Sequence, residues 1–240
     1  MSVWHRYTAL VKARLSSPSS ARYAAPVYSA PPNHSALNEL NFTVFDTETS
    51  GLLADKHHIV QIASMRIQAQ ALDLGSAWSA LIDTQGAVQP DSRLIHEIRP
   101  EEQRYGHPEA HVLREFLHGA SNSVLLAYDA DFDLAFLRRA WKRHAWGKFD
   151  VLCLDLTRLA ALVLPDWQGQ AQGLDDCLGY CGINPADQDR HDALGDTFLA
   201  ASLALVLLRK AQQQGWHTLA ELQLALRHRD LLHRNARLGC

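Results

Sequence analysis

Asp46 and Glu48 are two carboxylates that follow directly on an apolar stretch, Phe42-Thr43-Val44-Phe45. This β-branched and aromatic stretch predicts a buried strand. Side chains two residues apart on a strand share a face, with Cα atoms about 6.6 Å apart, so the two acids repel unless a positive group lies between them. Because Mg²⁺ and Mn²⁺ prefer oxygen ligands, the pair indicates a divalent-cation site. Taken alone, however, the pair favours a simpler interpretation, a polar strand end that faces solvent.

A second acidic segment follows the short apolar stretch 123–127, which predicts another buried strand. Asp131 and Asp133 come next, in the first turn of a predicted helix. Acids at that place offset the helix dipole or cap the helix, and this explains Asp131. It explains Asp133 less well, because Phe132 and Leu134 place it inside an apolar segment.

A third acidic segment begins at His191-Asp192, where Asp192 is the natural N-cap of a predicted helix. His191 and Asp196 are five residues apart, about 140° around a regular helix, so they do not share a face. We therefore expect His191 in the preceding loop, reaching a site that Asp196 approaches from the helix. An ordinary acidic helix start is the alternative interpretation.

The elements that must position these side chains follow from the periodicity of the apolar residues. Early strands and later helices indicate an α/β protein, with a central sheet flanked by helices. The predicted strands are 42–45, 58–67, 77–82 and 123–127, and the predicted helices are 112–117, 132–146, 154–164, 174–181, 192–213 and 218–236.

Composition excludes several classes of protein. The 240 residues are 47% hydrophobic and 20% charged, which argues against a wholly disordered chain. There is no run of about 20 apolar residues, so we expect no membrane association. Four cysteines do not make a disulfide scaffold, and a cytoplasmic location is expected. With a net charge of −3, the protein must meet any polyanion through local basic groups or bound cations.

The three acidic segments together, in this order, resemble the DnaQ-like exonucleases of the DEDDh branch. FDTETSGL is close to the family form D-T-E-T-T-G-L, AYDADFDLAFL resembles H-N-A-x-F-D, and HDALGDT resembles H-x-A-L-x-D-A. The spacing of five between His191 and Asp196 is that of the His branch. Ile95-His96-Glu97-Ile98 also resembles the H-G-I segment of the family, and the resemblance covers residues 40–213 or so.

This resemblance implies a ribonuclease H-like fold with a mixed five-stranded sheet and two bound Mg²⁺ or Mn²⁺ ions. The implied metal ligands are Asp46, Glu48, Asp133 and Asp196, with Glu48 and His191 as catalytic residues and His191 as the general base. Tyr128 and Asp129 replace the His-Asn pair of the family. Asp129 adds a negative charge where the family has a neutral Asn. Two consequences stay open, a change of substrate specificity and a role in holding a cation. The implied substrate-binding residues are Thr47, Thr49, Leu52, His96, Tyr128 and Asp129.

The predicted function is a metal-dependent 3′→5′ exonuclease that removes nucleoside 5′-monophosphates from single-stranded DNA ends, as in proofreading or repair. An RNA or short-oligonucleotide exonuclease is the alternative, and a non-catalytic module that binds nucleic-acid ends or a polymerase is an alternative of another class. Single-stranded 3′ ends are the expected partners, with DNA favoured over RNA, together with a DNA polymerase or repair protein. We expect a basic, flexible arm at 1–38, which has no Asp or Glu, the exonuclease domain at 39–215 and a packed helical extension at 216–240.

Overall fold

A mixed five-stranded sheet forms the centre of the computed structural model, which describes residues 24–84, 98, 102, 105–167, 173–185 and 192–238. The strand order is β3-β2-β1-β4-β5. Strand β1 pairs antiparallel with β2 and parallel with β4, β2 and β3 are antiparallel, and β4 and β5 are parallel. The strands are β1 (Asn41–Thr49), β2 (Ile59–Gln68), β3 (Ala71–Leu81), β4 (Ser123–Ala127) and β5 (Cys153–Asp155).

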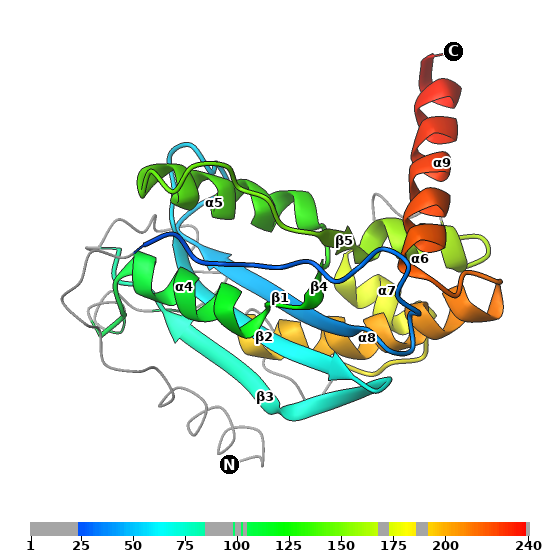
Figure 1. Ribbon diagram of the computed structural model, residues 1–240, viewed down its shortest axis with the longest axis horizontal. Coiled ribbons are helices and arrows are strands. Elements are labelled where there is room, and N and C mark those ends of the chain that lie inside the picture. The colour runs from blue at the N-terminus through cyan, green and yellow to red at the C-terminus, as the bar shows by residue number, and fades with distance from the viewer. Residues whose placement is uncertain are drawn as a thin grey trace.

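Helices cover both faces of this sheet (Figure 1). Two of them, α4 and α5, pack on one face, and the other helices pack on the opposite face, where the long α8 crosses β1 and β2. The helices are α4 (Glu109–Gly119), α5 (Ala130–Arg143), α6 (Leu156–Val163), α7 (Leu174–Tyr180), α8 (Ala193–Gln213) and α9 (Leu219–Leu238). The expected α/β architecture, a ribonuclease H-like sheet of five strands between helices, is confirmed.

The alternation of β1 decides which face receives the acids. Phe42 and Val44 lie in the core that includes α8, whereas Phe45 lies in the core on the α4–α5 side. Because alternate residues of a strand share a face, Asp46 and Glu48 continue the row of Phe42 and Val44 toward the α8 side.

Two predicted elements differ most from the structure in their extent. The predicted helix 154–164 is instead the short strand β5 followed by α6, since Asp155 ends the strand and caps the helix by accepting the backbone N–H groups of Thr157 and Arg158. Three residues of strand are too few to show a period. The predicted strand 77–82 begins earlier, at Ala71. The first half of β3 pairs with β2 at the sheet edge while its residues stay exposed or half-buried, so it lacks the buried apolar pattern of the second half.

The described part of the expected arm contacts the domain. The Tyr28 hydroxyl donates to the Ser123 carbonyl at 2.7 Å, and Leu37, buried in the core, donates its backbone N–H to His217 at 2.8 Å. Residues 1–23 lie outside the described chain, so the division at residue 38 stays a prediction.

Helix α9 is anchored at its beginning, where Leu219, Leu222 and Leu226 are buried. Its other end stands away from the sheet (Figure 1), where Leu231 and Leu232 are exposed. No helix in the described segments combines the length and the apolar character needed to span a membrane.

Candidate active site

Three carboxylates meet where β1 ends and α8 begins. Asp46 and Glu48 come from β1, and Asp196 comes from the first turn of α8. One carboxylate oxygen from each lies within 4.8 Å of the other two. No other group of three or more potential ligands this close together occurs in the described segments. Asp46 and Glu48 were predicted to share one face of their strand. Helix α8 packs on that face of β1 and brings Asp196 to them.

Asp133 reaches β1 from its other side. Strand β4 runs parallel to β1, and α5 begins soon after it, so the first turn of α5 lies near the carboxyl end of β1. The Thr47 hydroxyl donates to Asp133 Oδ1 at 2.5 Å. Asp133 is therefore hydrogen-bonded to Thr47, the residue between Asp46 and Glu48, although it lies outside the tight group of three carboxylates.

Burial dominates the electrostatics of Asp133. Its side chain is 3% exposed, and burial raises the pKa of its carboxyl from 3.8 to about 7. Hydrogen bonds from the Thr47 hydroxyl and from backbone N–H groups oppose this rise. A carboxyl buried in this way is ionised at low cost only when positive charge is close by.

The donor set fits a divalent cation. Three close carboxylates are all hard oxygen ligands, which suit Mg²⁺ or Mn²⁺ better than the softer, sulfur-preferring metals. Mutual repulsion would also be relieved by a cation among them. The chain therefore contains a candidate metal site formed by Asp46, Glu48 and Asp196, with the buried carboxyl of Asp133 nearby.

The turn after β1 shapes the surface beside these acids. Thr49 is buried, and its hydroxyl donates to the Gly51 carbonyl at 2.9 Å. Gly51 lies against the His57 ring, where an added Cβ would come within 2.7 Å. Leu52 is 77% exposed at the tip of the turn. The threonine side chains at 47 and 49 thus contact the protein itself, while the Leu52 side chain is open to solvent.

Tyr128 and Asp129 replace the His-Asn pair of the family. Tyr128 makes a hydrogen bond to the start of α7, and Asp129 has a left-handed backbone conformation. The Tyr128 hydroxyl donates to the Gly173 carbonyl at 3.0 Å, which ties the end of β4 to α7, and burial raises the pKa of Tyr128. Asp129 adopts the left-handed conformation, with φ 55° and ψ 51°. Asn and Asp tolerate this conformation better than other side-chain-bearing residues do. Asp129, where the family has Asn, is therefore compatible with the left-handed backbone at this position.

His96 and His191, the two histidines of the predicted site, lie outside the described residues. Their roles stay predictions. Gln61 was not among the residues predicted for the site, and it is 2% exposed inside β2. A glutamine among Ile59, Val60 and Ile62 is the signal that could have found it, because a buried amide needs partners.

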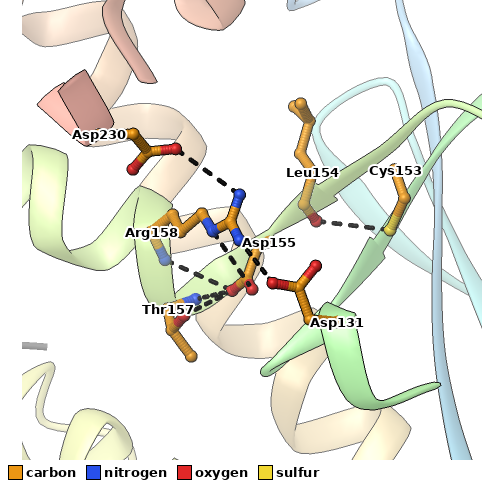
Figure 2. Close-up of polar contacts among 7 residues, drawn as sticks. All are labelled: Asp131, Cys153, Leu154, Asp155, Thr157, Arg158 and Asp230. Atoms are coloured by element: carbon orange, nitrogen blue, oxygen red, sulfur yellow. Dashed lines mark hydrogen bonds and ion pairs between the residues drawn. The ribbon is translucent and has the colours of Figure 1, made fainter. Parts of the chain in front are cut away.

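Ion pairs of Arg158 join the start of α5 to α6 and α9 (Figure 2). Arg158 of α6 lies among three carboxylates, at 2.5 Å from Asp131, 3.9 Å from Asp155 and 3.6 Å from Asp230. Asp131 is two residues before Asp133, and Asp230 is in α9. Because Arg158, Asp131 and Asp230 are partly exposed, the ion pairs that join α6 to α5 and α9 add little to the stability of the fold.

The sheet order, with acids gathered at the end of its central strand, defines the class of ribonuclease H-like nucleases. The chain belongs to the RNase_T exonuclease family, which its residues 43–204 match. The resemblance to DnaQ-like exonucleases is thereby confirmed. Divalent-metal dependence is a property of this family, and the acidic group is the candidate site for it.

Relatives by sequence carry polymerase names. A DNA polymerase III subunit epsilon-like protein of Rhodobacter capsulatus is 35% identical over 201 residues, covering 83% of this chain and 28% of that protein. A PolC-type DNA polymerase III of Streptococcus mutans is 26% identical over 137 residues, covering 57% of this chain and 9% of that protein. The chain thus spans about a quarter or less of the length of these relatives.

Solved structures show the same fold. E. coli exonuclease I in complex with a dT13 oligonucleotide aligns with a TM-score of 0.58 and 22% identity, over 73% of this chain and 42% of that one. A moderately thermophilic exonuclease I from Methylocaldum szegediense aligns with a TM-score of 0.59 and 20% identity, over 73% and 41% of the two chains.

Proposed function

We propose that this protein is a metal-dependent 3′→5′ exonuclease that releases nucleoside 5′-monophosphates from single-stranded DNA ends. The observation that carries the proposal is the convergence of Asp46, Glu48 and Asp196 within 4.8 Å, in a chain of the exonuclease family. Retention of these acids and of Asp133 also argues against a non-catalytic binding module.

The four carboxylates are the proposed ligands of two Mg²⁺ or Mn²⁺ ions. The chemistry that such cations supply is activation of the attacking water and stabilisation of the leaving oxygen. Thr47 orients one proposed ligand by donating its hydroxyl to Asp133. His191 is the proposed general base, since an imidazole with an ordinary pKa near 6.5 accepts a proton at neutral pH.

The turn after β1 is the proposed contact for the terminal nucleotide. The exposed Leu52 offers an apolar surface to a base, and the buried Thr49 holds the turn that presents it by donating to the Gly51 carbonyl. The buried Thr47, also a proposed contact, donates to Asp133. His96, Tyr128 and Asp129 stay proposed substrate-binding residues.

Single-stranded DNA is the proposed substrate because the relatives bear DNA polymerase III names and exonuclease I is seen with dT13. A DNA polymerase or repair partner and a cytoplasmic location also stay predictions.

The test is a gel assay of the purified protein on 5′-labelled single-stranded DNA and RNA of one sequence, with Mg²⁺, Mn²⁺ or EDTA. We expect a metal-dependent ladder that shortens from the 3′ end, and faster shortening of DNA. Asp46→Asn should abolish the ladder and keep the fold by circular dichroism. Asp150→Asn, which changes an exposed carboxylate paired with Lys148, is the matched control and should leave the ladder intact.

Each outcome decides one part of the proposal. Equal or faster shortening of RNA would contradict the proposal that DNA is the preferred substrate. An active Asp46→Asn variant would overturn the ligand assignment, and a protein inactive with both metals on both substrates would overturn the activity itself.

A further inference from the structure

A buried chain of polar side chains lies under the beginning of α8. Gln61 of β2 donates through Nε2 to Ser79 Oγ of β3 at 3.1 Å and to Asp192 Oδ1 at 3.0 Å. Gln61 and Ser79 are each 2% exposed. These hydrogen bonds connect the sheet interior to the residue at which α8 starts.

Asp192 stands at the N-cap position but does not cap its own helix. An aspartate there ordinarily accepts a backbone N–H of the first helical turn. The Asp192 side chain makes no such bond, and its Oδ1 accepts the Gln61 amide instead. The start of α8 is therefore anchored to the sheet.

The same residue fixes the backbone of Asp196. The Asp192 carbonyl accepts the Asp196 N–H at 3.0 Å, the first hydrogen bond of α8. A shift of Asp192 relative to the sheet would thus be passed directly to Asp196.

Gln61 also lies next to the other side of the acidic group. It is the register partner of Glu48 in the antiparallel pair of β1 and β2. Directly opposite residues point to the same face, with Cβ atoms about 4.5–5.5 Å apart. Gln61 therefore lies between the strand that carries Asp46 and Glu48 and the helix that carries Asp196.

The cost of burying the Gln61 amide indicates that this side chain does more than fill space in the core. Gln61 Oε1 is buried and has no hydrogen-bond partner among the described residues. An unpaired buried acceptor is unfavourable, and an apolar side chain of similar volume avoids that cost. A glutamine at this place is thus explained by the Asp192 anchor that its Nε2 provides.

We propose that Gln61 is a positioning residue for the metal site. It anchors Asp192 and, through the first turn of α8, holds the Asp196 carboxylate against Asp46 and Glu48, so that it sets the affinity for a divalent cation. This inference rests on the proposed function, because it assigns those three carboxylates to a cation.

The test measures Mn²⁺ binding directly, by the electron paramagnetic resonance signal of free Mn²⁺, in wild type, Gln61→Met and Gln68→Met. Loss of a group that contacts a metal ligand directly typically weakens affinity by about 10- to 100-fold. Gln61 contacts Asp192, whose carbonyl accepts the Asp196 N–H, so it acts one residue further out, and we expect the Mn²⁺ Kd of Gln61→Met to rise about tenfold. Cleavage by Gln61→Met should recover at saturating Mn²⁺. Gln68→Met is the matched control on an exposed position of the same strand and should bind Mn²⁺ as wild type does.

A double-mutant cycle with Asp192→Ala keeps the test decisive even if Gln61→Met lowers the melting temperature. The inference expects the double variant to lose no more Mn²⁺ affinity than the worse single variant, because both remove one contact. Additive losses, or wild-type Mn²⁺ affinity in Gln61→Met, would overturn it. If wild type itself does not bind Mn²⁺, the failure belongs to the proposed function instead.

Discussion

Replacing Asp133 with Asn should stabilise the metal-free protein at alkaline pH while it abolishes cleavage. The side chain is 3% exposed, and burial raises its pKa from 3.8 to about 7. Asn has the same shape and carries no charge, and its Oδ1 can still accept the Thr47 hydroxyl that now donates to Asp133. The variant therefore removes the cost of a buried charge and keeps the Thr47 hydrogen bond, while it replaces one carboxylate oxygen that can accept a backbone N–H. The loss of that acceptor does not depend on pH, so the pH dependence isolates the charge.

The sign and size follow from linkage. Because the folded protein holds this proton more tightly than the unfolded chain, Asp133 makes stability fall as the pH rises from about 4 to about 7. At about 1.36 kcal/mol for each pH unit, the full penalty above pH 7 is at most about 4 kcal/mol. The stability advantage of Asp133→Asn should therefore widen by about 2–3 kcal/mol between pH 5 and pH 8.

Urea denaturation in EDTA at pH 5 and pH 8 measures this difference. Mn²⁺ at pH 8 should stabilise wild type more than the variant, since a bound cation favours the ionised carboxyl. An advantage of the same size at both pH values would refute the reasoning, because a packing effect does not depend on pH.

Substitutions at three further positions test the loops beside the acids. Asp129→Asn should keep stability and activity, whereas Asp129→Val should cost about 1–2 kcal/mol in urea denaturation, because a β-branched residue is strained in the left-handed conformation. Gly51→Ala should lose about 1–3 kcal/mol, because its Cβ would meet the His57 ring at 2.7 Å, and Gly179→Ala, with open space around it, is the control. Leu52→Ala should leave the melting temperature within about 1–2 °C, because the side chain is 77% exposed, while KM for single-stranded DNA rises.

Each of these three expectations has a result that would contradict it. A stable Asp129→Val variant would mean that the backbone can leave the left-handed region without cost. A Gly51→Ala variant as stable as Gly179→Ala would mean that the His57 ring can move away from the added Cβ without a loss of stability. An unchanged KM in Leu52→Ala would remove Leu52 from the proposed nucleotide contact.

The local patterns of the sequence already determined a large part of this protein. The period of two in β1 was enough to place Asp46 and Glu48 on one face, and apolar periodicity located most strands and helices. The order of the acidic motifs was enough to identify the exonuclease family, which the match over residues 43–204 confirms. These features depend on neighbours in the chain, so they can be read from short segments.

Only the tertiary structure decided which distant residues meet. The approach of Asp196 to the β1 acids depends on how α8 packs, and the contact of Asp133 with Thr47 depends on the parallel pairing of β4 with β1. The anchoring of Asp192 by Gln61 joins residues 131 positions apart. The strand β5 was missed for the same reason, because pairing with β4, and not its own sequence, makes those three residues extended. Long-range packing and pairing energies leave no periodic trace in the sequence, so they become visible only in the folded chain.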